Sequence, residues 1–177
     1  HNVANALAAL ALGHSAGLPM SGMKAALQNF KGLPHRCELV AEIDGVRYVN
    51  DSKGTNIGAA EAALRGLGGE RNILLIAGGQ GKGADFSQLQ QAVVRHCKLL
   101  ILMGEDAPLL QQALSSSAPV IMVSSLEEAV NVAATQAQTG DVVLLSPACA
   151  SFDMFSGYVQ RGEAFCALVK RLPENLR

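Results

Sequence analysis

Short runs of aliphatic residues that alternate with helical segments constrain the fold of this chain most strongly. These runs lie at residues 72–77, 99–103, 120–123 and 142–145. Each is short enough for a strand, and its continuous apolar character indicates burial on both faces of a sheet. Such strands separated by helices predict a mostly parallel sheet covered by helices on both sides, which is an α/β fold.

One hairpin precedes this alternating region. Residues 37–43 and 46–49 have a hydrophobic period of two, and they flank Asp44-Gly45, a strong signal for a two-residue β-hairpin. Beyond the hairpin, apolar spacings of three and four residues predict helices, which lie at residues 56–67, 86–97, 107–114, 126–138 and 158–172.

The beginning of the chain differs from the rest. Residues 1–30 are helical in pattern, and Gly32-Leu33-Pro34 then has the composition of a linker. The start lacks the basic region of a signal peptide and reads as the middle of a helix, so we interpret the chain as a piece of a longer protein. We expect residues 1–31 to be the tail of a preceding domain and residues 32–177 to form a domain.

Composition excludes several classes of protein. The net charge is −1 and aromatic residues make up 4% of the 177 residues, with no tryptophan, which argues against a nucleic-acid-binding protein. No apolar run reaches the roughly 18 residues of a membrane helix. The four cysteines are widely spaced, which favours buried thiols in a reducing cytoplasm. We therefore expect a cytoplasmic protein without a membrane segment.

Polar turns follow the predicted parallel strands, and they lie at residues 51–56, 78–85, 104–106 and 146–157. In open α/β sheets, ligands bind outside the carboxyl ends of the strands. The convergence of these turns at one edge therefore predicts a binding site there.

Two of these turns carry a lysine. Lys53 comes just before a predicted helix, whose free N–H groups and dipole favour an anion, and Thr55 adds a hydroxyl donor. Lys82 stands among glycines that let the backbone approach a ligand closely. Together they predict a site for anionic groups, although a capped turn with a solvated lysine explains Lys53 equally well.

The Lys82 turn also admits a second interpretation. It is not a P-loop, but Gly79-x-Gly81-x-x-Ala84 follows a strand and Glu105 lies about twenty residues on, as in dinucleotide-binding turns. This weak match keeps open a non-enzymatic module that binds NAD. A third possibility is a structural domain whose lysines are only solvated.

Other polar residues have less defined roles. Ser151 could donate to a bound carboxylate, and Asp51 could accept from a ribose hydroxyl or cap its turn. Arg36, after His35, could hold a phosphate, although a surface ion pair is the default interpretation. Cys149 is more plausible as a small apolar filler than as a nucleophile. No catalytic triad or metal-site spacing is evident.

Several motifs in order resemble the carboxy-terminal part of the Mur ligases of peptidoglycan synthesis. These motifs are His-Asn-x-x-Asn at residues 1–5, Gly-Leu-Pro-His-Arg at 32–36, Asp-Ser-Lys-Gly-Thr-Asn at 51–56, Gly-Gly-x-Gly-Lys at 78–82 and Ser-Pro-Ala-x-Ala-Ser-x-Asp at 146–153. The resemblance covers essentially the whole chain and is strongest to the D-glutamate-adding branch. It implies a Rossmann-like amino-acid-binding domain at residues 32–177, preceded by the helical tail of the central ATPase domain.

The resemblance also implies a reaction. The parent enzyme uses ATP to phosphorylate the carboxylate of UDP-N-acetylmuramoyl-L-alanine, and the amine of D-glutamate attacks the acyl phosphate to form an amide. ATP and Mg²⁺ are bound mainly by the missing central domain, so this piece is expected to be inactive alone and to hold no cofactor tightly. A monomer is expected. A related ligase of the folylpolyglutamate synthase class is the main enzymatic alternative.

By the same resemblance, two sets of residues receive roles. D-Glutamate contacts fall on Lys53, Thr55, Lys82, Ser151 and Phe152, with Tyr158 packing nearby. Contacts with ATP or ADP fall on Asn2, Asn5, His35, Arg36 and Asp51. No catalytic residue is assigned with certainty within this piece.

Overall fold

The structure, a computed structural model, describes residues 2–30 and 32–175 and divides into two compact units. The first unit ends at Leu33 and the second begins at Pro34. This division falls inside the linker expected from the sequence. The assignment of residues 1–31 to a preceding ATPase domain stays a prediction.

The first unit is a pair of helices, α1 (Asn2–Ser15) and α2 (Met20–Asn29). These bounds confirm the expected helical pattern. The unit has little core: α2 buries no residue, and the exposed fraction of Val3 and of Leu12 is 74%. Isolated helices of this length are marginal in water, so this helix pair needs contacts that it does not make within itself.

The second unit begins with the predicted hairpin of β1 (Glu38–Ile43) and β2 (Val46–Asn50). Asp44 and Gly45 form its turn with φ of 52° and 76°. Positive φ at both turn positions matches the right-handed twist of the flanking strands, which explains why Asp-Gly is favoured there.

The six-stranded sheet has the order β1-β2-β6-β3-β4-β5, with every pair parallel except the hairpin. The remaining strands are β3 (Ile73–Gly78), β4 (Cys97–Met103), β5 (Val120–Met122) and β6 (Val142–Leu145). The helices are α3 (Ile57–Leu67), α4 (Gln90–His96), α5 (Ala107–Leu114), α6 (Leu126–Gln136) and α7 (Tyr158–Asn175), with a 3₁₀ helix η1 (Phe86–Leu89). The predicted α/β fold is confirmed.

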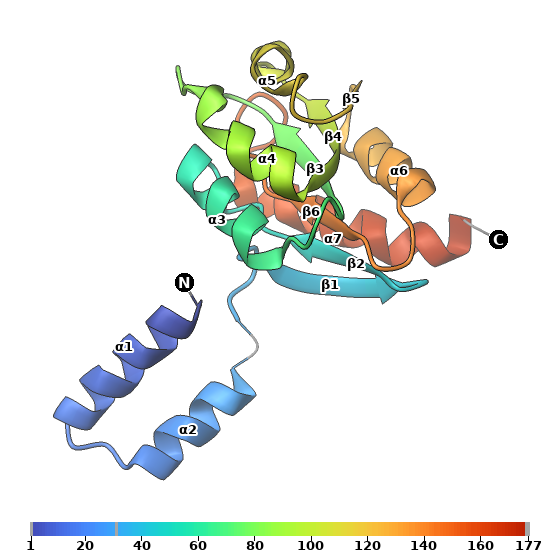
Figure 1. Cartoon of the computed structure of the whole chain (residues 1–177). Helices are drawn as coiled ribbons and strands as arrows, with labels where there is room; N and C mark the ends of the chain where they lie inside the picture. Colours follow the sequence, from blue (N-terminus) through green and yellow to red (C-terminus); the bar gives the residue numbers. More distant parts are fainter. Residues whose placement is uncertain (1, 31, 176–177) are drawn as a thin grey trace. The chain divides into compact units, whose positions relative to one another are not determined.

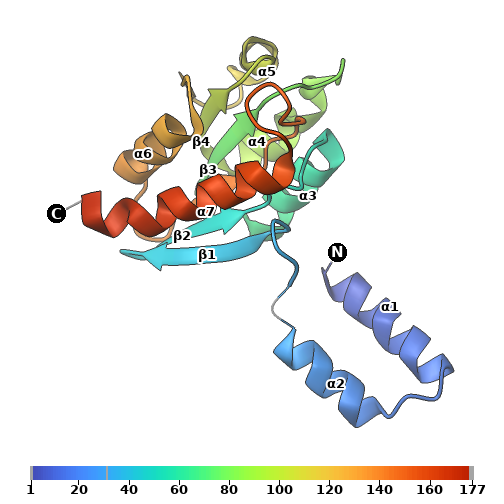
Figure 2. The ribbon, with the colours of Figure 1, turned by 180° about the vertical axis from the view of Figure 1, so that it is seen from behind.

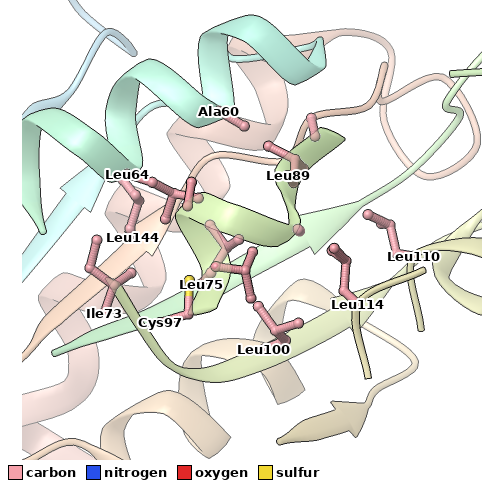
Figure 3. Packing of buried hydrophobic residues seen from close by; sticks show 14 of the residues in the cluster. Ala60, Leu64, Ile73, Leu75, Leu89, Cys97, Leu100, Leu110, Leu114 and Leu144 are labelled. Atoms are coloured by element: carbon pink, nitrogen blue, oxygen red, sulfur yellow. The ribbon is translucent and has the colours of Figure 1, made fainter. Parts of the chain in front are cut away.

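Each parallel strand sends alternate side chains into two hydrophobic cores, one on each side of the sheet. Along β3, Ile73 and Leu75 face α3, η1, α4 and α5, whereas Leu74 and Ile76 face α6 and α7. Figure 1 shows α3 and α4 covering one side, and Figure 2 shows α6 and α7 covering the other. Figure 3 shows part of the first core, where Leu64 of α3 packs near the sheet. Burial on both faces explains the continuous apolar runs in the sequence.

The helix predicted over residues 86–97 forms, but it is not uniform and it ends one residue earlier than predicted. Its first turn is the 3₁₀ helix η1, which Asp85 caps by accepting from Ser87 N, and α4 stops at His96. Cys97 is extended and pairs with Ile73 as the first residue of β4. Its fully buried side chain packs in the first core, so tertiary packing overrides the helical period at this point.

None of the helices in the described part of the chain combines the length and the apolar character needed to span a membrane.

Candidate functional site

The predicted polar turns follow neighbouring parallel strands. The turns at residues 51–56, 146–157, 78–85 and 104–106 follow β2, β6, β3 and β4, which is the order of these strands across the sheet. Parallel strands place their carboxyl ends at one edge (Figure 1), so the turns gather there. The candidate site is this edge.

The turn that carries Lys53 is held by backbone hydrogen bonds from both sides. Lys53 N donates to His35 O at 3.0 Å, and Ala148 N donates to Gly54 O at 2.9 Å. Asn56 then caps α3 by accepting from Ala59 N at 2.9 Å. The half-buried Lys53 thus comes just before the amino terminus of an ordered helix, as the sequence predicts.

Asp51 ties this turn to two other segments. One carboxylate oxygen accepts from Ser146 Oγ at 2.7 Å, and the other accepts from Cys37 N at 3.2 Å. Burial raises the pKa of Asp51, an effect that the hydrogen bonds from Ser146 and Cys37 oppose. Asp51 therefore acts as a tether within this structure, and its contact with a ribose stays a prediction.

Buried Asn50 orients the ring of His35. Asn50 Oδ1 accepts from Ser52 N at 3.1 Å, which places Nδ2 2.9 Å from His35 Nδ1. Because an amide nitrogen only donates, His35 Nδ1 is the acceptor in this contact. The ring packs edge-on against Tyr158, with centroids 6.1 Å apart. His35 is thus held in one orientation beside the Lys53 turn.

Arg161 joins the Lys53 turn to the loop after β6. Its guanidinium donates to Ser52 Oγ and to the carbonyl oxygens of Ser52 and Cys149 at 3.0–3.2 Å. The exposed fraction of Arg161 is 1%, and burial lowers its pKa to about 10. Within the described residues, neither of the two ion pairs includes it. A buried cation that donates to the hydroxyl and carbonyl of Ser52 and to the carbonyl of Cys149 fixes the relative position of these two segments.

The Lys82 turn is held at its start. Gln80 and Ala150 exchange two backbone hydrogen bonds of 2.9 Å, and a Cβ at Gly79 would overlap Ala150 O. The approach therefore requires glycine, which also accommodates the φ of 123° at Gly79. Asp106 Oδ2 then accepts from Gly81 N at 2.6 Å. Lys82 itself is exposed and has a φ of 53°.

Both lysines lie against aromatic residues of the segment that follows β6. Lys53 Nζ is 4.1 Å from the ring centroid of Tyr158, and Lys82 Nζ is 5.9 Å from that of Phe152. Ser151, which is 2% exposed, is adjacent to Phe152 in this segment. Neither lysine takes part in the two ion pairs of the described side chains. The ammonium of Lys53 thus lies against the first residue of α7, and that of Lys82 lies against the loop that leads into this helix.

Other predicted residues are less constrained. Thr55 is half-buried in the Lys53 turn. Arg36 is exposed, and its charge opposes the rise that burial causes in the pKa of Asp51. Asn5 is exposed on α1, in the first unit, and the side chain of Asn2 lies outside the described part. Because the two units are described separately, the predicted nucleotide contacts of Asn2 and Asn5 stay predictions.

The structure disfavours the dinucleotide interpretation of the Lys82 turn. The Gly81 N–H that would face a pyrophosphate already donates to the Asp106 carboxylate, whose negative charge would repel a phosphate. Glu105, the residue at the ribose position, accepts from Gln80 Nε2 at 2.8 Å. The turn leads into a 3₁₀ helix of four residues rather than into the long helix of a dinucleotide site.

Cysteine and metal chemistry receive no support. Cys149 is fully buried, and burial raises its pKa to about 12, so its thiol is protonated near neutral pH. This agrees with the interpretation of Cys149 as an apolar filler. Among the described side chains, no three His, Cys, Asp or Glu residues gather in a group that could hold a metal ion.

Sequence reasoning missed the residues that hold the turns together, namely Asn50, Asp106, Asp153 and Arg161. Asp106 stood in a predicted polar turn, and Asp153, which accepts from Glu105 N at 2.9 Å, stood in another. A carboxylate in a polar turn indicated that such a residue could accept a hydrogen bond. The sequence did not show which residue of another turn would donate that bond. Arg161 lies three residues after Tyr158 on α7, a spacing that places both on one face.

Comparisons with known proteins agree with this architecture. A sequence profile described as "Mur ligase, glutamate ligase domain" matches residues 35–149. UDP-N-acetylmuramoylalanine–D-glutamate ligase of Pseudomonas fluorescens is 56% identical over 174 residues, which is 97% of this chain and 39% of that protein. The enzyme of the same name from Nitrosococcus oceani is 54% identical over 97% of this chain and 38% of its own length. The chain therefore spans about two fifths of these curated relatives.

Two solved structures show the same fold at low sequence identity. UDP-N-acetylmuramate-alanine ligase from Thermotoga maritima has a TM-score of 0.71 and 19% identity, covering 99% of this chain and 38% of that one. A bifunctional folylpolyglutamate synthase/dihydrofolate synthase from Yersinia pestis has a TM-score of 0.64 and 19% identity, covering 86% and 35%. The fold is thus shared between ligase classes, whereas the relatives that are 54–56% identical carry the name of one class. The chain belongs to the Mur ligase family, whose glutamate ligase domain accounts for most of its length.

Proposed function

We propose that this chain is the amino-acid-binding part of an ATP-dependent ligase that joins D-glutamate to UDP-N-acetylmuramoyl-L-alanine. The observation that carries the proposal is the placement of Lys53 and Lys82, neither of which forms an ion pair with a described side chain, against two aromatic rings of the segment that follows β6. Two ammonium groups match the two carboxylates of glutamate. The names of the relatives, which are 54–56% identical over nearly the whole chain, support the same activity.

The proposed role of the site is to bind and orient the amino acid. Lys53 and Lys82 would neutralise its two carboxylates, while the hydroxyls of Thr55 and Ser151 would donate hydrogen bonds to them. Tyr158 and the exposed Phe152 would pack against the aliphatic part. The neutral amine of D-glutamate would then attack the carbonyl carbon of the acyl phosphate, and inorganic phosphate would leave as the amide forms.

In this proposal the nucleotide binds beside the Lys53 turn, where the second unit begins. His35, Arg36 and Asp51 would contact ATP or ADP together with Asn2 and Asn5. Residues 1–31 would belong to the central ATPase domain and residues 32–177 would form the carboxy-terminal domain. ATP and Mg²⁺ would be held mainly by the rest of the enzyme, and no step is assigned to a metal bound by this chain. We expect a cytoplasmic monomer and an inactive isolated piece.

The test is a substrate comparison with the full-length protein that contains this chain. We expect phosphate release from ATP to require both UDP-N-acetylmuramoyl-L-alanine and D-glutamate, with L-glutamate as the matched control. Release that instead required a folate and L-glutamate would contradict the proposal and favour the folylpolyglutamate synthase class, whose fold is similar. Saturable NAD binding without ligase activity would favour the dinucleotide module.

A further inference from the structure

Asp106 occupies the N-cap position of α5 but does not cap that helix. An aspartate at this position normally accepts a hydrogen bond from an N–H in the first turn of its own helix. The side chain of Asp106 makes no such bond, and its φ of −97° and ψ of 16° lie outside the extended region usual for a cap. The Asp106 carboxylate instead accepts a hydrogen bond from a residue outside α5.

Asp106 forms hydrogen bonds with the turn that carries Lys82. Asp106 Oδ2 accepts from Gly81 N at 2.6 Å, and Asp106 N donates to Gly79 O at 2.9 Å. Hydrogen bonds to an ionised carboxylate are shorter and stronger than those between neutral groups. Asp106, which lies in the turn after the neighbouring strand β4, therefore holds the Gln80–Gly81 peptide group, one peptide group before the one that joins Gly81 to Lys82.

Few other contacts control this part of the turn. Ala150 N donates to Gln80 O of the same peptide group, and the bond from Ala84 N to Gly81 O closes the turn on itself. Lys82 is exposed between Gly81 and Gly83, and glycines have the widest backbone freedom. From outside the turn, the Asp106 side chain thus acts together with the Ala150 backbone to restrict the direction from which Lys82 extends.

We propose that Asp106 is a positioning residue that sets the location of the Lys82 ammonium and so tunes D-glutamate affinity. This inference rests on the proposed function. Asp106 does not touch the amino acid in this account; it acts through Lys82. The two possible effects of Asp106 change D-glutamate affinity in opposite directions. If Asp106 acted only through its negative charge, it would repel the carboxylates of glutamate, and neutralising it would tighten binding. If it positions Lys82, neutralising it should weaken binding.

The first experiment measures steady-state constants of the full-length ligase for Asp106→Ala and Asp106→Asn. Loss of a charge-assisted hydrogen bond predicts a rise of about tenfold in the KM for D-glutamate for Asp106→Ala. The amide oxygen of Asp106→Asn still accepts, so the rise should be about threefold. The KM for ATP should change by less than about twofold. Glu127→Gln, which removes an exposed carboxylate from the first turn of α6, is the matched control and should leave all constants unchanged.

A double-mutant cycle separates positioning from general destabilisation. In a Lys82→Ala background, Asp106→Ala should have little further effect on kcat/KM for D-glutamate, because the group that it positions is gone. The Asp106→Asn variant completes the same cycle if Asp106→Ala folds poorly. Additive losses, or tighter binding by Asp106→Asn, would overturn the inference. A wild-type enzyme without D-glutamate-dependent activity would instead overturn the proposed function.

Discussion

The two lysine turns are built in contrasting ways. The Lys53 turn is packed into the domain: Arg161, Asp51 and Asn50 connect it to segments far away in the sequence, and it leads into the capped helix α3. The Lys82 turn is rich in glycine, more exposed and held by Asp106 and the Gln80–Ala150 bridge. The comparison indicates that one cation is fixed by the fold, whereas the other depends on a few replaceable contacts.

The largest effect is expected for the stability of the Lys53 turn. Arg161→Met should lower the free energy of unfolding of the 177-residue chain by about 2–4 kcal/mol, because the buried carbonyl oxygens of Ser52 and Cys149 lose their donor. Arg171→Met, an exposed position on the same helix, is the control and should change stability by less than about 0.5 kcal/mol. Urea unfolding measures both. Equal, small losses would show that the Lys53 turn is not held by Arg161.

Lys82→Ala tests the role of the exposed Lys82 turn in binding D-glutamate. It should reduce kcat/KM of the full-length ligase for D-glutamate by about 10- to 100-fold, the cost of one charge-assisted hydrogen bond. Because Lys82 is exposed, the stability of the chain should stay nearly the same. Steady-state kinetics and thermal unfolding together give both values. Unchanged kinetic constants would refute the role assigned to Lys82.

A smaller effect is expected where Lys53 meets Tyr158. The ammonium lies 4.1 Å from the ring centroid, so Tyr158→Leu should weaken the placement of Lys53 by about 0.5–1 kcal/mol, or roughly threefold in the KM for D-glutamate. Tyr158→Phe keeps the aromatic face and serves as the matched control, with no measurable change. A large loss with Tyr158→Phe would indicate that the phenol oxygen, rather than the ring, is the important group.

The smallest and most local test compares carboxyl titrations in the two turns. Burial raises the pKa of Asp51, whereas hydrogen bonds from Ser87 lower the pKa of the exposed Asp85. For Asp51, stability should be highest below the unfolded pKa of 3.8 and fall as pH rises through the folded pKa. For Asp85 the contribution is present above 3.8 and lost as pH falls through the folded pKa. Carboxyl carbon NMR should place the two midpoints on opposite sides of 3.8; midpoints on the same side would contradict the contrast.

The fold could be predicted where local sequence and tertiary structure agree. The apolar runs of β3 and β6 and the Asp44-Gly45 turn each satisfy one local rule, and the structure follows them. The helix end predicted at Cys97 was wrong, because the side chain of Cys97 packs in a core formed by residues distant in the sequence. The local hydrophobic period does not show such contacts.

The candidate site shows the same contrast between what local sequence indicates and what distant contacts decide. Lys53 and Lys82 stand out because charged residues in turns after buried strands have few structural reasons to be there. Asp106 and Arg161 could not be assigned, since their partners Gly81 and Ser52 are 25 and 109 residues away. Sequence patterns thus indicated the groups that would meet a ligand and missed those that hold them in place.

The most direct test of the central claim is a crystal structure of the full-length ligase with D-glutamate bound. The account predicts Lys53 Nζ and Lys82 Nζ each within hydrogen-bonding distance of a carboxylate oxygen of the same glutamate molecule. A glutamate bound away from the loop after β6, or held there with either lysine paired to a protein carboxylate instead, would contradict it.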